Sequence, residues 1–149
     1  MRPSELRTRM LAEHDDLKQR IVSIRGALTT RGGELALSAE LKARIERFSV
    51  ALTAHMAHEE AYLAPALRQS TNWRDQNLND LRAHHDAQRE KLRVLMLALR
   101  DPEVPAEVII HDVSMLLEEV EADVAEEDAQ VLTTRMLRDD VVSIDASDG

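Results

Sequence analysis

The chain has 149 residues, of which 44% are hydrophobic but only 2% aromatic, so aliphatic side chains must fill a single core. Its formal net charge of −9 argues against nucleic acid or an anionic membrane as a partner. The lack of cysteine excludes disulfides, thiol chemistry and thiolate metal sites. No stretch is apolar enough for a signal peptide or a membrane span, so we expect a soluble, cytoplasmic protein.

Four helical segments are predicted from the spacing of apolar residues and the positions of helix-breaking residues. Gly32 and Gly33 follow the first segment, and Pro102 and Pro105 separate the third from the fourth. Pro65 should kink the second helix or end it, because proline removes a backbone donor and crowds the preceding turn. The predicted segments are residues 4–29, 38–67, 77–100 and 106–137.

The connections between these segments are short, and short connections place successive helices beside each other in opposite directions. The predicted fold class is therefore all-α, an antiparallel up-down-up-down four-helix bundle over residues 1–138. Residues 139–149 are predicted to form a flexible acidic tail.

Each predicted helix interrupts its apolar seam with a side chain that can bind a metal. His14 lies on the edge of the seam in the first helix. In the second helix, Glu59 falls within the seam, and His55 precedes it by four residues, so both point from one face. His85 lies near the centre of the third seam, and Glu127 lies inside the fourth. In an antiparallel bundle all five would fall at the same level.

Acidic side chains among leucines and valines need a compensating charge. A buried, unpaired carboxylate is strongly destabilising unless it takes up a proton. A divalent or trivalent cation between Glu59 and Glu127 would cancel their mutual repulsion. A His-x-x-x-Glu pair on a helix offers an imidazole nitrogen and a carboxylate to one metal. The sequence therefore predicts a metal site.

This pattern resembles the hemerythrin-like family, also called the HHE cation-binding domain. The matching elements are His14 within residues 12–17, the stretch from His55 to Pro65, and His84 with His85. The resemblance covers roughly residues 5–135. It implies a four-helix bundle that holds two non-haem irons, bridged by carboxylates, and that binds or reacts with O2, peroxide or NO, or reports on iron.

The resemblance also implies roles for individual residues. His14 would be the ligand from the first helix. His55 would be a terminal ligand from the second helix, and Glu59 would be a bridging carboxylate. His85 would be the ligand from the third helix, with His84 as the alternative.

On the fourth helix, Glu127 would match the second bridging carboxylate. Oxygen-carrying members of the family have a histidine four or five residues before that carboxylate, but Asp123 stands there in this chain. Glu126 with Glu121 is the alternative pair. Such oxygen carriers also have two histidines on the third helix, four residues apart, and His85 has no such neighbour.

These departures make the expected site rich in carboxylate. Carboxylate ligands favour Fe(III) and also suit Mn, and they argue against reversible O2 carriage. The expected metal ligands are His14, His55, Glu59, His85, Asp123 and Glu127.

Three functions are compatible with the sequence. The first is a non-haem di-iron protein whose partners are metal ions and small oxidants such as O2, peroxide or NO, with weak peroxidase or catalase-like activity as an open question. The second is an iron-responsive sensor or regulatory binding module. The third is a helical interaction domain whose metal site has degenerated.

Overall fold

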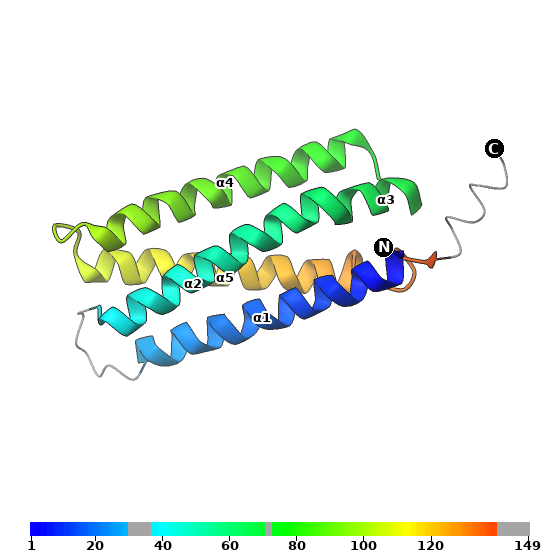
Figure 1. The fold of residues 1–149 in the computed structure, drawn as a ribbon. Coiled ribbons are helices and arrows are strands. Elements are labelled where there is room, and N and C mark those ends of the chain that lie inside the picture. The colour runs from blue at the N-terminus through cyan, green and yellow to red at the C-terminus, as the bar shows by residue number, and fades with distance from the viewer. Residues whose placement is uncertain (30–36, 71–72, 140–149) are drawn as a thin grey trace.

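The computed structural model describes residues 1–29, 37–70 and 73–139, and these residues are helical with short connections and no strand. In Figure 1, α1, α4 and α5 lie lengthwise beside a further rod that α2, η1 and α3 form together. The helical elements are α1 (Pro3–Thr29), α2 (Ala39–His58), the π-helical segment η1 (Glu59–Leu63), α3 (Ala64–Ser70), α4 (Asp75–Arg100) and α5 (Ala106–Gln130). The chain is thus a helical bundle, as the sequence predicted.

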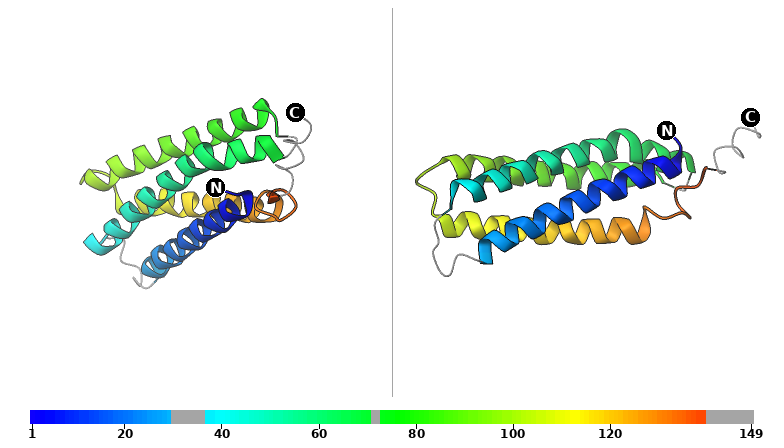
Figure 2. Two further views of the ribbon diagram at one scale, coloured as in Figure 1. Left: turned by 45° about the vertical axis from the view of Figure 1, so that its right-hand side comes forward. Right: turned by 60° about the horizontal axis from the view of Figure 1, so that its bottom comes forward.

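Successive helices meet at alternate ends of the molecule (Figures 1 and 2). The end of α1 lies near the start of α2, the end of α3 near the start of α4, and the end of α4 near the start of α5. Helix α1 packs against α2 and α5, and α4 packs against the same two helices from the other side. Early residues of α1 and α4 therefore lie level with late residues of α2 and α5.

The starts of two helices have local causes in the sequence. The Ser38 side chain accepts a hydrogen bond from the backbone N–H of Leu41 at 3.1 Å, which caps α2. Helix α4 begins at Asp75, two residues before the predicted start. The Asn77 side chain, inside the first turn, accepts a hydrogen bond from the Arg74 N–H at 2.9 Å.

Pro65 does not end its helix. The rod continues to Ser70, beyond the predicted boundary at Leu67, because the turn immediately before the proline is a π-helix. Within it, the N–H of Ala64 bonds to the carbonyl of Glu59, five residues back. This wider turn accommodates the proline ring, which would crowd a regular α-helical turn.

Helix α5 ends at Gln130, so the predicted boundary at 137 was wrong. The following residues include Thr133, whose hydroxyl accepts a hydrogen bond from the N–H of Met136 at 3.1 Å and so favours a turn. At the start of the predicted tail, Asp139 accepts hydrogen bonds from Ser4 at 2.7 and 2.9 Å. The rest of that tail, 140–149, lies outside the described residues.

The apolar interior is divided into two clusters. The larger fills the end of the bundle where α1 and α4 finish, and Phe48 and Leu117 are among its fully buried members. The smaller contains Leu6, Met10 and Leu67 at the opposite end. Between these clusters, α1, the α2–η1 junction and α4 bury polar side chains, and half-buried Glu127 of α5 joins the same group.

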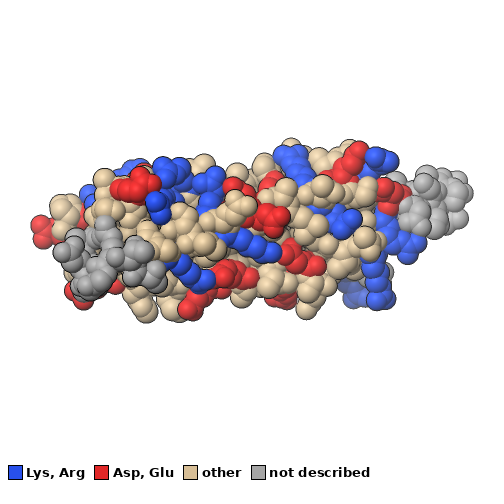
Figure 3. Space-filling view, turned by 90° about the horizontal axis from the view of Figure 1, so that it is seen from below, with Lys and Arg blue, Asp and Glu red and all other residues tan. Residues whose placement is uncertain are grey.

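The surface carries charges of both signs. On the long face seen in Figure 3, acidic and basic side chains are interspersed. Exposed ion pairs along the helices, such as Arg20 with Asp16 at 2.8 Å, contribute only modestly to stability. Over the described residues, no helix has the combination of length and apolar character needed to cross a membrane.

Candidate metal centre

The polar layer between the two apolar clusters is deeply buried. His14, His55, Glu59 and His85 are each between 1% and 4% exposed, whereas Glu127 keeps a fifth of its side chain accessible. Imidazole and carboxylate groups are rarely buried to this extent unless they are paired or hold a metal. Helix α1, the α2–η1 junction, α4 and α5 contribute one or two of these residues each.

Four of the predicted ligands converge on one point. His14 Nε2 lies 3.2 Å from His55 Nε2 and 2.9 Å from Glu127 Oε2. His55 Nε2 lies 2.6 Å from Glu59 Oε1. One donor atom from each of these four residues falls within 4.8 Å of all the others, close enough for a single cation to contact them all.

The outer nitrogens of both histidines are held by carboxylates from neighbouring helices. His14 Nδ1 donates to Asp128 at 2.7 Å, and His55 Nδ1 donates to Glu13 at 2.9 Å. The second oxygen of Glu13 accepts from His58 Nδ1 at 2.8 Å. Because an ionised carboxylate can only accept, the Nδ1 atom in each of these contacts carries a proton. The Nε2 atoms of His14 and His55 are therefore the ones directed at the centre.

His85 reaches the same layer from α4 but has weaker partners. Its Nε2 atom lies 3.8 Å from Glu59 Oε2, and its Nδ1 atom lies 3.5 Å from Glu60 Oε2. No described residue hydrogen-bonds to the buried Nδ1 atom. Burial lowers the pKa of His85, so its imidazole is neutral near pH 7 and can offer a lone pair. Glu60 is instead paired with Arg89.

Asp123 lies outside the group of four. Its Oδ2 atom contacts His84 Nε2 at 2.7 Å and accepts a hydrogen bond from the Gln88 amide at 2.6 Å. Gln88 also donates to Glu119 at 3.4 Å. Donor atoms of His84, Glu119 and Asp123 lie within 4.8 Å of one another, and 44% of the His84 side chain is exposed.

The alternatives left open by the sequence are placed differently. Of the two adjacent histidines, His85 is buried in the polar layer and His84 lies at its edge. On α5, Glu127 faces the other donors. Glu126 is exposed, and Glu121 forms an ion pair with Arg25.

A small cavity of about 20 Å³ lies between the donors. Its wall includes His55, Glu59, His85, Asp123 and Glu127, so it joins the group of four to His85 and Asp123. A volume of this size is on the scale of one water molecule or ion. His55, Glu59 and Glu127, which contact one another or His14 directly, therefore share this small space with His85 and Asp123.

The charges in this layer are strongly coupled. Burial alone lowers the pKa of His55, but its hydrogen bonds to Glu127 and Glu59 outweigh burial and raise the pKa to about 10. The pKa of His14 is also raised: burial lowers it, and the contacts with Glu127 and Asp128 prevail. Burial, assisted by the charge of Glu127, raises the pKa of Glu59 to about 7.

Glu127 responds in the opposite direction. Burial raises its pKa, but hydrogen bonds from His14 and His55 outweigh burial and hold the pKa below its usual range. Without a metal, the imidazole protons therefore balance the carboxylate charge. A cation bound at this point would replace those protons.

A family model described as the hemerythrin HHE cation binding domain matches residues 6–134. The chain belongs to this family. The comparisons with curated proteins and with solved structures gave no significant match. The resemblance inferred from His14, the His55–Pro65 stretch and His84–His85 is thus confirmed at the level of the family.

Within this hemerythrin HHE domain, the structure brings two further residues to the polar layer that the sequence motifs did not indicate. Glu13 joins His55 to His58, and Gln88 joins His84, Asp123 and Glu119. Both were detectable in principle. Glu13 lies three residues after Met10, and Gln88 lies three residues after His85, so each is a polar residue at seam spacing.

Proposed function

We propose that this hemerythrin HHE domain is a non-haem di-iron protein that binds or reacts with O2, peroxide or NO. The observation that carries the proposal is the buried convergence of His14, His55, Glu59 and Glu127 within 4.8 Å. The up-down-up-down order expected for such a bundle is part of the same proposal. It would bring donors from all four rods to one level.

The donors fit a metal on three counts. Imidazole nitrogen and carboxylate oxygen suit iron and also manganese, and the chain has no thiolate to favour a softer ion. His85 is a buried imidazole with a lowered pKa, so near pH 7 the ring is neutral and one of its nitrogens has a lone pair to offer a metal. In the metal-free protein, protons on His14 and His55 balance the charge of the two central carboxylates, and a cation can replace those protons.

Two ions are proposed because Glu59 faces two ways. One of its oxygens lies 2.6 Å from His55, and the other is turned towards His85 at 3.8 Å. A carboxylate in this position can bridge an ion held by His14 and His55 and a second ion held by His85. Glu127 would be the second bridge. Asp123, on the wall of the same cavity, would be the remaining ligand of the second ion.

A bound iron pair would supply two-electron redox chemistry to a small oxidant. The residues of this chain would hold and orient the pair. Asp128 and Glu13 keep the protons of His14 and His55 on Nδ1, and the two apolar clusters keep bulk water away from the layer. With Asp123 in place of a histidine, the ligand set is rich in negative charge, which argues against reversible O2 carriage and favours redox turnover.

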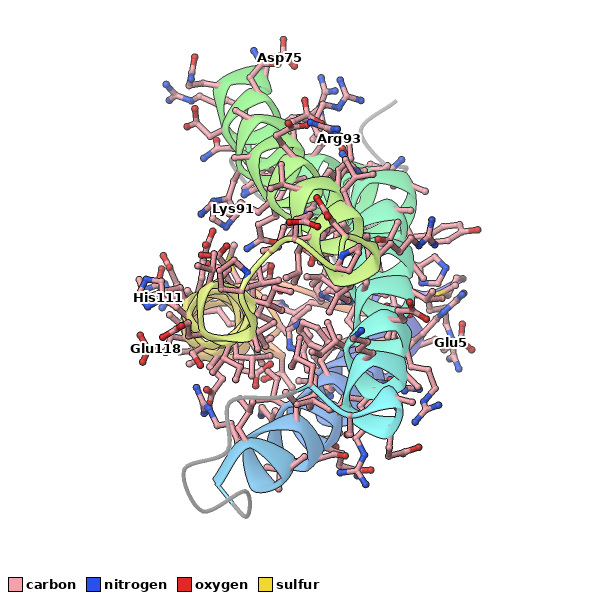
Figure 4. All side chains as sticks on the ribbon, turned by 90° about the vertical axis from the view of Figure 1, so that its left-hand side faces the viewer. Glu5, Asp75, Lys91, Arg93, His111 and Glu118 are labelled. Atoms are coloured by element: carbon pink, nitrogen blue, oxygen red, sulfur yellow. The ribbon has the colours of Figure 1, made fainter. Side chains whose placement is uncertain are left out.

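The first test is the iron content of untagged protein after anaerobic loading with Fe(II). We expect about two irons per chain, and clear losses in His85→Gln and Glu127→Gln. The matched controls are His111→Gln and Glu118→Gln, whose side chains project from the outer face of α5 in Figure 4 and should leave the iron content unchanged. Iron below about a tenth of an equivalent in the wild-type protein would reject the proposal and favour a degenerate, metal-free interaction domain.

An iron-responsive regulatory module is the second candidate. The metal-free layer places several charges between two apolar clusters, so metal occupancy should stabilise the bundle. Peroxide distinguishes the two functions. Repeated turnover with retention of iron favours a weak peroxidase or catalase-like activity, whereas a single reaction with loss of iron favours the sensor.

A further inference from the structure

An open groove lies between α4 and α5 on the surface. It has a volume of about 680 Å³, and its apolar lining comes from Val94 and Leu95 on α4 and from Met115 and Leu116 on α5. Leu95 and Leu116 are buried core residues that form its floor. Val94 and Met115 are 48% and 54% exposed, so two exposed large apolar side chains lie together on the wall of the groove.

Two further exposed apolar side chains lie on the same helices, outside the lining of the groove. Leu97 follows Val94 by one turn and is 56% exposed, and Val108 precedes Met115 by two turns and is 46% exposed. These four residues are half of the exposed large hydrophobic residues of the described chain. Seven helical residues rise by about 10 Å, so the exposed apolar residues of α5 are spread along that helix.

Acidic side chains dominate the rim. The groove is bordered by four carboxylates and one amine, a formal charge of −3, from Glu90, Lys91, Asp112, Glu118 and Glu119. Lys91 is paired with Glu119 at 2.7 Å, and Glu90 with Arg93 at 2.6 Å. Figure 4 shows Lys91 and Glu118 projecting on the same side of the molecule.

Two of the rim carboxylates remain available to a ligand. Asp112 and Glu118 are exposed, and neither forms an ion pair with another described residue. They lie on the α5 side of the groove, where they border Met115 on either side along the helix. A ligand of this groove should therefore combine an apolar face with positive charge.

We propose that the α4–α5 groove binds an amphipathic helix of a partner protein, with its apolar face on Val94 and Met115 and its lysine or arginine side chains beside Asp112 and Glu118. An apolar groove between two helices is a surface that an amphipathic helix fits. The acidic rim favours a helix that carries basic residues beside its apolar face, and it speeds the association of that helix with the groove. This inference does not depend on metal binding.

Charge repulsion disfavours two other possible ligands of the groove. A second copy of the chain seated on the same groove would bring one acidic rim against another. The C-terminal segment 140–149 has apolar residues, but it contains three aspartates and no lysine or arginine. Like-charge repulsion disfavours it at this rim.

The test uses the full chain and a fluorescein-labelled synthetic helix with leucines along one face and lysines on both flanks. A matched peptide carries glutamate in place of lysine. In the protein, Met115→Lys places a charged side chain in the apolar groove. Val50→Lys is its control, because Val50 is 71% exposed on α2. The pair Asp112→Asn and Glu118→Gln removes the free rim charges, and Asp15→Asn with Glu46→Gln removes the same charge elsewhere.

Fluorescence anisotropy should show binding of the basic peptide, at least about tenfold weaker in Met115→Lys than in Val50→Lys. The double charge variant should bind several-fold more weakly than its control, and the acidic peptide should not bind. Amide shifts in two-dimensional NMR should fall on α4 and α5. Equal binding by Met115→Lys and Val50→Lys, shifts confined to other helices, or equal affinity for both peptides would overturn the proposal. The proposal would also fail if the protein bound neither peptide and instead self-associated in a way that Met115→Lys abolishes.

Discussion

His14 and His55 bring their Nε2 atoms to 3.2 Å, while the Nδ1 atom of each bonds to a carboxylate from another helix. Asp128 holds His14, and Glu13 holds His55. These two contacts hold a proton on the Nδ1 atom of each ring and direct both Nε2 atoms at one place in the interior. The structure thus contains an orienting arrangement around the proposed metal ligands as well as the ligands themselves.

Glu13→Gln should weaken metal binding without removing a ligand. The neutral amide is a poorer acceptor for the Nδ1 proton of His55, and it also loosens His58. Losing such an outer contact typically costs about 10–100-fold in metal affinity. Anaerobic calorimetry with Fe(II) or Mn(II) measures the change. Asp15→Asn, an exposed change two residues away, should have no effect, and an unaltered affinity in Glu13→Gln would show that His55 needs no such support.

Glu59→Gln should separate metal binding from folding. In the metal-free protein, the amide removes a buried carboxyl whose pKa burial has raised to about 7, so the loss of stability should be small. With metal, the change removes the proposed bridge, so iron content should fall to about one ion per chain or less. Thermal unfolding with and without Mn(II) tests both parts. A stabilisation by Mn(II) as large as in the wild-type protein would exclude Glu59 as a ligand.

The stability of the metal-free protein should fall as the pH rises above about 6.5. Hydrogen bonds to Glu127 and Glu59, which outweigh burial, raise the pKa of His55 from 6.5 to about 10, so the folded chain retains a proton that the unfolded chain releases. This stabilisation is complete below pH 6.5 and is lost as the pH rises through 10. The raised pKa of Glu59 acts in the same direction between 4.5 and about 7.

Metal binding should show the opposite trend over the same range. A metal must displace protons from the donors, so its affinity rises as the pH increases. The gap between the unfolding temperatures of loaded and metal-free protein should therefore widen between about pH 6.5 and 8.5. A gap that narrows over this range would contradict the assignment of His14 and His55 as ligands.

Asp123→Asn tests the proposed second ion. In the metal-free structure, Asp123 bonds to His84 and Gln88. Replacing its carboxylate by the asparagine amide should therefore cost about 1 kcal/mol of folding stability. If Asp123 serves the second ion, the variant should keep the first iron and bind the second more weakly, as metal titration would show. Asp86→Asn on α4 is an exposed control. Two irons bound with wild-type affinity would mean that Asp123 only positions His84 and Gln88.

Phe48→Ala should destabilise the bundle without changing the metal content. Phe48 is the one phenylalanine of the chain and is 2% exposed in the larger apolar cluster. Its truncation leaves a cavity and should cost about 3–5 kcal/mol. Val50→Ala, at a 71% exposed position of the same helix, should cost far less. Chemical denaturation measures both changes, and similar losses in the two variants would contradict the described packing.

The sequence by itself determined that the chain is all-helical, that it belongs among hemerythrin-like domains, and that polar residues interrupt its seams. Helical periodicity converts spacing along the chain into a shared face, so His55 with Glu59 was readable without a structure. The ends of the helices were harder to predict from the sequence. Pro65 was expected to kink the helix or end it; a π-helical turn precedes the proline, and the rod continues to Ser70.

Only the tertiary structure decided which polar residues meet. Along α5, adjacent carboxylates differ by about 100° in direction, so the rotation of the helix selects Glu127 over Glu126. The same rotation turns Asp123 towards His84 and Gln88 and brings Asp128 to His14. Helix rotation and axial shift depend on packing between helices, and no pattern within a single helix encodes them.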